Sequence, residues 1–186
     1  MPEIELTPMQ YFILKILSSD KQNPIKGNIL LQKIAFLIFQ NFDVIFSEAY
    51  FIKHRFGPYS AVVDTISKDL EYMQYLSKVN NEYSITSKGL TEMSNYETSI
   101  PRKYIKILDE TCDFIKNDFK SFNSNEMLAF VYKEFPEYRE QSIVDNELDY
   151  ENIFNAMYKS GKLGISKIAE LMGWSLDKTY DFLNQK

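Results

Sequence analysis

Residues 165–183 combine an amphipathic helix pattern with the residues that a chain needs to reverse direction between two helices. Ala169 is small at a position where two helices cross closely, and Gly173, four residues later, permits a sharp turn. Ser175 can cap a second helix directly after that turn. This spacing predicts a helix-turn-helix. The alternative interpretation is a helical hairpin that packs in the same way and binds no partner.

Three helices are expected before residue 75. The first has Thr7 as its cap and Pro8 at the first helical position, where the missing N–H costs nothing. The second, over about residues 28–42, is apolar on nearly every side. Such a helix lies either in the middle of a core or in a subunit interface. The third is capped by Ser60, and its apolar positions keep helical spacing as far as Met73.

Two β signals accompany these helices. Residues 50–56 read as a short strand. Further on, β-like runs at 76–79 and 82–85 flank Asn80 and Asn81, which tolerate the positive φ of a tight turn, so a hairpin is expected. Helix, helix, strand, helix and hairpin is the order of elements in a winged helix. The third helix would be its recognition helix, and the asparagine pair the tip of its wing.

The sequence therefore predicts a mainly α protein with a small β-hairpin. It would consist of a winged helix-turn-helix followed by a helical C-terminal region that contains a second helix-turn-helix. We place the domain boundary at residue 140, with a winged-helix domain and appended helices over 1–140 and the C-terminal helical module over 141–186. Residues 136–151 contain six acids and one base, which indicates a solvated linker.

The net charge of −5 is spread evenly along the chain. Residues 1–100 carry 9 Lys and Arg against 11 Asp and Glu, and residues 101–186 carry 12 against 15. A protein that depends on phosphate contacts normally presents a basic face, because neutralising phosphates supplies most of the non-specific affinity for nucleic acid. The even acidity therefore weighs against a simple DNA-binding function.

The sequence offers few groups for catalysis. His54 is the only histidine, which rules out a metal site built on two histidines, and there is no Walker-type loop, GxGxxG or CxxC motif. Cys112, the single cysteine, lies on an apolar helical stripe and is expected to be a buried structural thiol. We expect a non-enzymatic protein with no catalytic residue, metal or cofactor.

The same features bear on localisation. A single cysteine cannot form an intramolecular disulfide, which fits a reducing compartment. No secretory signal is recognisable, and the longest dense apolar run, residues 34–39, is too short to span a bilayer. We therefore expect a cytoplasmic protein that does not enter the membrane.

Basic residues cluster once, at Lys53-His54-Arg55. In a strand, Lys53 and Arg55 would share one face, either as a solvated edge or as part of a patch that contacts phosphates or an acidic partner. The second helix of the C-terminal motif offers two acids and one base, so its contact with DNA is an open question. The candidate DNA-binding or partner-binding residues are Lys53, Arg55, Tyr59, Ser60, Lys68, Lys78, Asn80, Asn81, Ser175, Lys178, Thr179 and Tyr180.

Several segments resemble known families. LQKIAFL at residues 31–37, FIKHRFGPYS at 51–60 and YSITSKG at 83–89 resemble a widespread prokaryotic group of winged-helix proteins related to the Panacea (SocA-like) antitoxin domain. That resemblance covers about residues 5–140. Residues 158–183 are similar to the C-terminal helix-turn-helix of a small family of archaeal and bacterial antitoxin-like proteins. Both resemblances imply a toxin–antitoxin system or transcription regulation.

The expected function is that of a non-enzymatic regulator with two recognition modules, which binds double-stranded DNA or acts as an antitoxin. The alternative is a protein–protein interaction module, in which an acidic winged helix binds a toxin-like or regulatory partner without touching DNA. The apolar second helix also predicts a homodimer.

Overall fold

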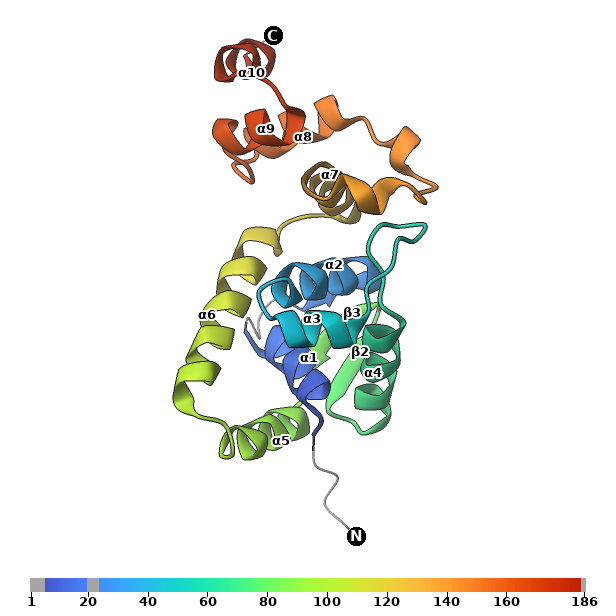
Figure 1. The fold of residues 1–186 in the computed structure, drawn as a ribbon, viewed down its shortest axis with the longest axis vertical. Helices are drawn as coiled ribbons and strands as arrows, with labels where there is room; N and C mark the ends of the chain where they lie inside the picture. Colours follow the sequence, from blue (N-terminus) through green and yellow to red (C-terminus); the bar gives the residue numbers. More distant parts are fainter. Residues whose placement is uncertain (1–5, 20–23, 185–186) are drawn as a thin grey trace. The chain divides into compact units, whose positions relative to one another are not determined.

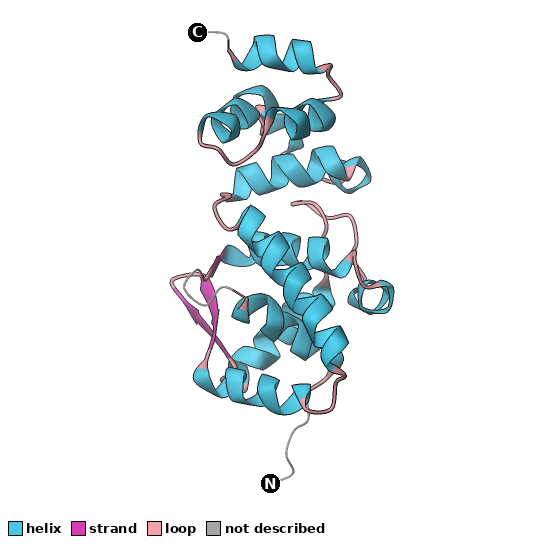
Figure 2. Ribbon diagram, turned by 90° about the vertical axis from the view of Figure 1, so that its left-hand side faces the viewer, coloured by secondary structure: helices cyan, strands magenta, loops and turns pink. Residues whose placement is uncertain are grey.

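The computed structural model describes residues 6–19 and 24–184. Within them the protein is mainly α-helical, with ten α-helices, two short 3-10 helices and one three-stranded antiparallel sheet (Figures 1 and 2). The predicted class, mainly α with a small β-hairpin, is confirmed. The chain forms two compact units. The first comprises Met1–Ile52 and Tyr59–Lys120, and the second comprises Lys53–Pro58 and Ser121–Lys186.

The first unit contains the sheet and six helices among its described residues. In chain order its elements are α1 (Pro8–Ser18), β1 (Ile25–Lys26), α2 (Gly27–Phe39), α3 (Asp43–Ala49), α4 (Ala61–Tyr72), β2 (Leu76–Val79), β3 (Glu82–Ile85), α5 (Ser87–Glu97) and α6 (Arg102–Phe119). The second unit is helical throughout its described residues. Its elements are α7 (Ser124–Glu134), the 3-10 helices η1 (Pro136–Arg139) and η2 (Asp145–Glu147), α8 (Tyr150–Lys159), α9 (Ile165–Met172) and α10 (Leu176–Leu183).

Side-chain caps fix the starts of α1 and α4, as the sequence predicts. The Thr7 hydroxyl accepts a hydrogen bond from the Gln10 N–H, and the Gln10 side chain accepts one from the Thr7 N–H, so the two residues form a capping box. The Ser60 hydroxyl likewise accepts from the Val63 N–H at 3.0 Å. These bonds satisfy donors that would otherwise have no partner at the helix start.

The predicted hairpin is present. β2 pairs with β3 in antiparallel register, with Lys78 opposite Tyr83. Asn80 and Asn81 form the turn with φ values of 51° and 63°, the positive values that a tight hairpin turn needs at both central residues. The two-residue strand β1 adds to the far side of β3, so the sheet order is β1-β3-β2 (Figure 2, magenta).

The strand predicted over residues 50–56 is wrong. Only an isolated bridge joins Ile52 to Tyr59, because the segment between them folds into a turn in which the Gly57 N–H donates to the His54 carbonyl at 3.0 Å. The helix expected over 28–42 ends at Phe39, and α3 follows separately. α3 ends at Ala49, and Tyr50, which caps its C-terminus, has a φ of 49° in the left-handed region.

α2 lies in the middle of the first unit's core. Eleven of its thirteen residues are buried. Phe36 and Phe39 pack edge-to-face against Phe51, with ring centroids 5.2 and 6.2 Å apart, and Phe12 of α1 packs against Phe39 at 5.7 Å. Of the two settings expected for a helix that is apolar on nearly every side, the structure places α2 in the core of its own unit.

The second unit begins after Lys120, because α7 packs against α8, α9 and η1. Residues 136–151 were expected to be a solvated linker, but they form η1 and η2 inside this unit. The Ser142 hydroxyl holds them: it accepts from the Tyr132 O–H at 2.8 Å and from the Val144 and Asp145 N–H groups at 3.1 and 3.0 Å.

The predicted reversal between α9 and α10 is also present. Gly173 has a φ of 64°, and the Ser175 hydroxyl accepts from the Lys178 N–H at 3.2 Å. Trp174 packs edge-to-face on Phe182, with ring centroids 5.2 Å apart, which joins the turn to α10. In the described part of the chain, no helix is long and apolar enough to cross a bilayer.

Candidate functional site

α4 and the β2–β3 hairpin bring two of the candidate residues together. Lys68 and Lys78 line a hollow of about 70 Å³ between the helix and β2. The Lys68 ammonium lies 2.7 Å from the Asp64 carboxylate, and the Lys78 ammonium lies 4.8 Å from the centroid of the Tyr83 ring. Both cations therefore have partners within the hollow.

Acidic groups outnumber basic ones on α4 and the hairpin. Residues 61–85 contain four acids and two lysines. Asp69 and Glu71 of α4 are exposed, and Asp64 is half-buried. Tyr72, at the end of the same helix, is 90% exposed. This surface is therefore acidic and aromatic, whereas a phosphate-binding surface would be basic.

Ser60 and Tyr59, both candidates for contact, have structural roles. The Ser60 side chain is fully buried and donates to the Ala49 carbonyl, while its backbone exchanges two hydrogen bonds with the Gln32 amide at 2.9 and 3.0 Å. Tyr59 is half-buried at the bridge to Ile52. The predicted contact role of Ser60 is wrong, because its polar atoms all bond inside the fold.

Asn80 and Asn81 are exposed at the hairpin tip, where they were expected. The Asn81 carbonyl accepts from the Gly27 N–H at 2.7 Å, at the start of α2. Because this bond holds the tip to the core helix, the hairpin is a positioned element of the first unit.

Lys53 and Arg55 belong to the second unit, and Tyr59, Ser60 and Lys68 to the first. The Lys53 ammonium lies 2.6 Å from the Glu140 carboxylate, and the Arg55 carbonyl accepts from the Ile143 N–H at 3.1 Å. The Arg55 side chain is exposed. Since residues 53–55 are not a strand, the predicted alternation of their side chains does not apply.

The first turn of α10 presents the C-terminal candidates. Lys178 is exposed, with its ammonium 4.0 Å from the centroid of the Trp174 ring. Tyr180 is also exposed, whereas Thr179 is buried and its hydroxyl donates to the Ser175 carbonyl at 2.8 Å. Thr179 therefore has a structural role in place of the predicted contact.

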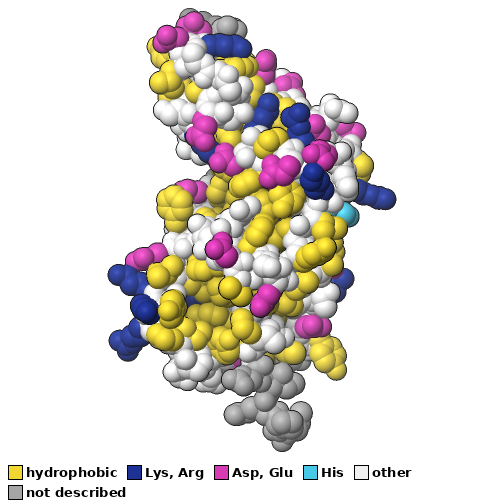
Figure 3. All heavy atoms as spheres, in the orientation of Figure 1, with side chains coloured by type: hydrophobic (Ala, Val, Ile, Leu, Met, Phe, Trp, Pro, Cys, Tyr) yellow, Lys and Arg dark blue, Asp and Glu magenta, His cyan; other side chains and the backbone are white. Residues whose placement is uncertain are grey.

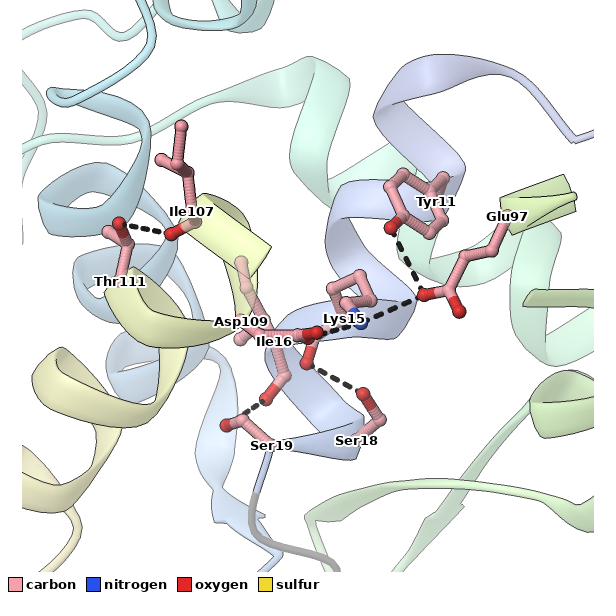
Figure 4. A network of polar contacts seen from close by, with 9 residues as sticks. All are labelled: Tyr11, Lys15, Ile16, Ser18, Ser19, Glu97, Ile107, Asp109 and Thr111. Carbon is pink, nitrogen blue, oxygen red and sulfur yellow. Dashed lines mark hydrogen bonds and ion pairs between the residues drawn. The ribbon is translucent and has the colours of Figure 1, made fainter. Parts of the chain in front are cut away.

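A buried charge network in the first unit has no counterpart in the sequence prediction (Figure 4). Lys15 of α1 pairs with Glu97 of α5 at 2.8 Å and with Asp109 of α6, and the Tyr11 hydroxyl donates to Glu97 at 3.1 Å. Burial opposes the charged form of Lys15, but its hydrogen bonds to the two carboxylates outweigh burial and raise its pKa. In the sequence, Lys15 lies between apolar residues on a helix face that is buried in the structure. Because a lysine is almost never fully buried without a partner, this position indicates that Lys15 pairs with an acidic side chain.

Two other buried groups have shifted pKa values. Burial lowers the pKa of Lys33 in α2 to about 7 and raises the pKa of the Cys112 thiol to about 12. Cys112 is fully buried, so the expected structural thiol is confirmed. Among the described residues, no three His, Cys, Asp or Glu side chains converge in a way that could hold a metal ion.

No protein-family model matches this sequence, and no curated protein matches it.

Proposed function

We propose that this protein is a non-enzymatic regulatory module that binds a basic partner protein through the exposed face of α4 and the adjoining β2–β3 hairpin. In this proposal the first unit acts as a winged helix, with α4 in the position of the recognition helix and the hairpin as the wing. An antitoxin-like role, in which this face covers a basic surface of a toxin, agrees with the family resemblance of residues 31–37, 51–60 and 83–89.

The charge of the α4 face is the observation that carries the proposal. Asp69 and Glu71 are exposed, and Lys68 is already paired with Asp64 on its own helix. Carboxylates facing phosphates repel them, whereas the same carboxylates attract a basic protein and speed its association. Tyr72, exposed beside them, is of a residue type enriched at the energetic centres of protein interfaces.

The test is site-specific crosslinking in the native cell. A photo-crosslinking amino acid replaces Thr65, which is exposed on α4. We expect one covalent product with a basic protein, lost at least about tenfold when Asp69→Lys and Glu71→Lys are combined. Glu151→Lys, which reverses an exposed acid on α8, is the matched control and should leave the product unchanged. A crosslinked product with an acidic protein or with DNA would overturn the proposal. So would a yield of crosslinked product that stays the same when Asp69→Lys and Glu71→Lys are combined.

Duplex DNA binding by the second unit is a second candidate function. The geometry of α9, Gly173 and α10 favours it, because the first turn of α10 is exposed and carries Lys178. In helix-turn-helix proteins the N-terminal residues of the second helix contact base edges.

Fluorescence anisotropy with a labelled mixed-sequence duplex, at two salt concentrations, tests this candidate. Binding that weakens steeply with salt and is lost in Lys178→Glu would support it. Lys159→Glu, at the exposed end of α8, is the control for a change of net charge. The absence of binding at low salt would exclude the candidate.

A further inference from the structure

α6 has one buried face and one exposed apolar face. Its inner side packs on α1 and α2. On its outer side Tyr104, Ile107 and Phe114 are 55%, 50% and 70% exposed. Together with Thr111 they follow spacings of three, four and three residues, which places them in one stripe. The Thr111 hydroxyl donates to the Ile107 carbonyl at 2.8 Å, so the stripe's polar group is satisfied within the helix (Figure 4).

The first two turns of α6 carry bases, which is opposite to the order that the helix dipole favours at a helix start. Arg102, Lys103 and Lys106 lie in its first five residues, whereas its later acids include Glu110 and Asp113. The partial positive charge at a helix N-terminus favours acids there, and the C-terminus favours bases. Lys106 and Glu110 form an ion pair along the helix at 3.6 Å, and Lys116 is a base in the last turn, but the bases in the first two turns oppose the helix dipole. The basic end is visible in Figure 3 as Lys and Arg side chains gathered at the edge of the first unit beside α6.

An apolar pocket of about 220 Å³ opens at the Tyr104 end of the stripe. Tyr104 and Ile107 line it together with Tyr11 and Phe12 of α1 and Tyr96 of α5. Its volume is below the roughly 300–1,000 Å³ of small-molecule sites and suits a single aromatic side chain. Hydrophobic side chains cover much of the surrounding surface in Figure 3.

We propose that this outer face of α6 binds the same face of a second copy of the chain, with the two helices antiparallel. A two-fold axis near residue 109 sets Phe114 of the partner subunit opposite Tyr104, at the mouth of the pocket. Phe114 and Tyr104 are ten residues apart, about 15 Å along a helix, so both ends of the interface fill at once. The same arrangement sets Lys103 and Lys106 against the partner's Glu110 and the partner's Asp113.

This pairing makes the α6 face self-complementary in shape and in charge, as a two-fold interface requires. It also aligns the two helix dipoles favourably. The surface is separate from the α4 face, so the dimer and the proposed partner can each be tested without the other.

Sedimentation equilibrium of the full chain is the first test. We expect a dimer at tens of micromolar, an order-of-magnitude range typical of moderate self-association. Phe114→Glu should weaken the dimer at least about a hundredfold, since it places a charge at the apolar pocket. Val44→Glu changes an equally exposed apolar residue on α3 and should leave the dimer intact. A wild-type chain that stays monomeric at about 100 μM, or a Val44→Glu effect equal to that of Phe114→Glu, would overturn the proposal.

Charge reversal tests the antiparallel orientation. Lys103→Glu with Lys106→Glu, and separately Glu110→Lys with Asp113→Lys, should each weaken the homodimer about tenfold or more. An equimolar mixture of the two double variants should form a heterodimer, and the combined fourfold variant should recover the homodimer. Circular dichroism checks that each variant is folded. If the mixture of the two double variants forms no heterodimer, the proposed pairing of the basic half of α6 with the acidic half of the partner's α6 is wrong.

Disulfide trapping separates antiparallel from parallel pairing. Glu110→Cys lies near the proposed axis and should form an interchain disulfide under mild oxidation. Lys103→Cys should not, because its two copies would be about 18 Å apart along the helices, beyond the reach of a disulfide. The wild type, whose Cys112 is buried, is the control. Efficient trapping at position 103 would contradict the antiparallel arrangement.

Discussion

The ammonium of Lys15 in α1 lies 2.8 Å from the Glu97 carboxylate in α5, although 82 residues separate them in the chain. The same ammonium contacts Asp109 in α6, so one lysine side chain joins three helices of the first unit. The Lys15 side chain is 6% exposed, so its ammonium loses most of its contact with water on folding. The two carboxylates compensate for that loss of solvation.

Lys15→Met should lower the free energy of unfolding by about 2–3 kcal/mol, because it leaves two neighbouring carboxylates without their cation. Urea denaturation at neutral pH measures the change. Lys26→Met is the control, since Lys26 lies 3.8 Å from Glu82 in an exposed pair, worth less than about 1 kcal/mol. Equal losses in the two variants would show that the buried network contributes no more to stability than the exposed pair does.

Lys33 makes stability depend on pH. Burial lowers its pKa in the folded protein to about 7 from the ordinary value of 10.5, so between these values the unfolded chain binds more protons. The free energy of unfolding should therefore rise from pH 7 to pH 9, by up to about 1.4 kcal/mol per pH unit from this group. Denaturation curves at pH 7, 8 and 9 measure the slope.

Lys33→Met should remove most of that rise. The comparison stops at pH 9 because Cys112 acts in the opposite direction above it: its thiol has an ordinary pKa of 9.0 and a folded pKa of about 12, so stability from this group is lost as pH rises. Identical slopes in wild type and variant would show that Lys33 stays charged in the folded protein.

Gly89 and Gly164 should respond differently to the same substitution. A Cβ at Gly89 would lie 2.2 Å from the Tyr75 carbonyl oxygen, a backbone atom that also accepts the Thr86 N–H. Gly89→Ala should therefore lower the melting temperature markedly, at a cost of about 2 kcal/mol or more. Gly164→Ala meets no atom within 4 Å and should change stability by less than about 1 kcal/mol. Equal melting temperatures for the two variants would contradict the close approach at Gly89.

The Cys112 thiol should be unreactive in the folded protein. It is fully buried and burial raises its pKa to about 12, so little thiolate is present or accessible at pH 8. Ellman's reagent at pH 8 should label it only at the rate at which the protein opens, and should label one thiol per chain at once in 6 M urea. Rapid labelling without denaturant would place the thiol at the surface.

Local signals predicted much of this fold. Asn80 and Asn81 specify a turn by their own backbone preferences, and Gly173 and Ser175 do the same between α9 and α10, so these elements occur where expected. β1 was missed because it is two residues long and exists only through its pairing with β3.

Residues that depend on distant parts of the chain could not be placed in this way. The hydroxyls of Ser60 and Thr179 looked available for contact, but each bonds to the backbone of its own unit. The partners of Lys15 lie on two helices far along the sequence, and no periodicity brings them together. Residues 50–56 have strand composition, yet a strand needs a neighbour along its whole length, and only Ile52 finds one.

The segment Lys53–Pro58 belongs to the second unit although its neighbours on both sides belong to the first. The chain thus passes between the units three times, and Glu140 and Ile143 contact residues that precede them by more than eighty positions. A gene cut at residue 120 would separate this segment from its partners. A protein made of residues 121–186 alone would therefore lack the Lys53–Glu140 ion pair and the hydrogen bond from Ile143 to Arg55.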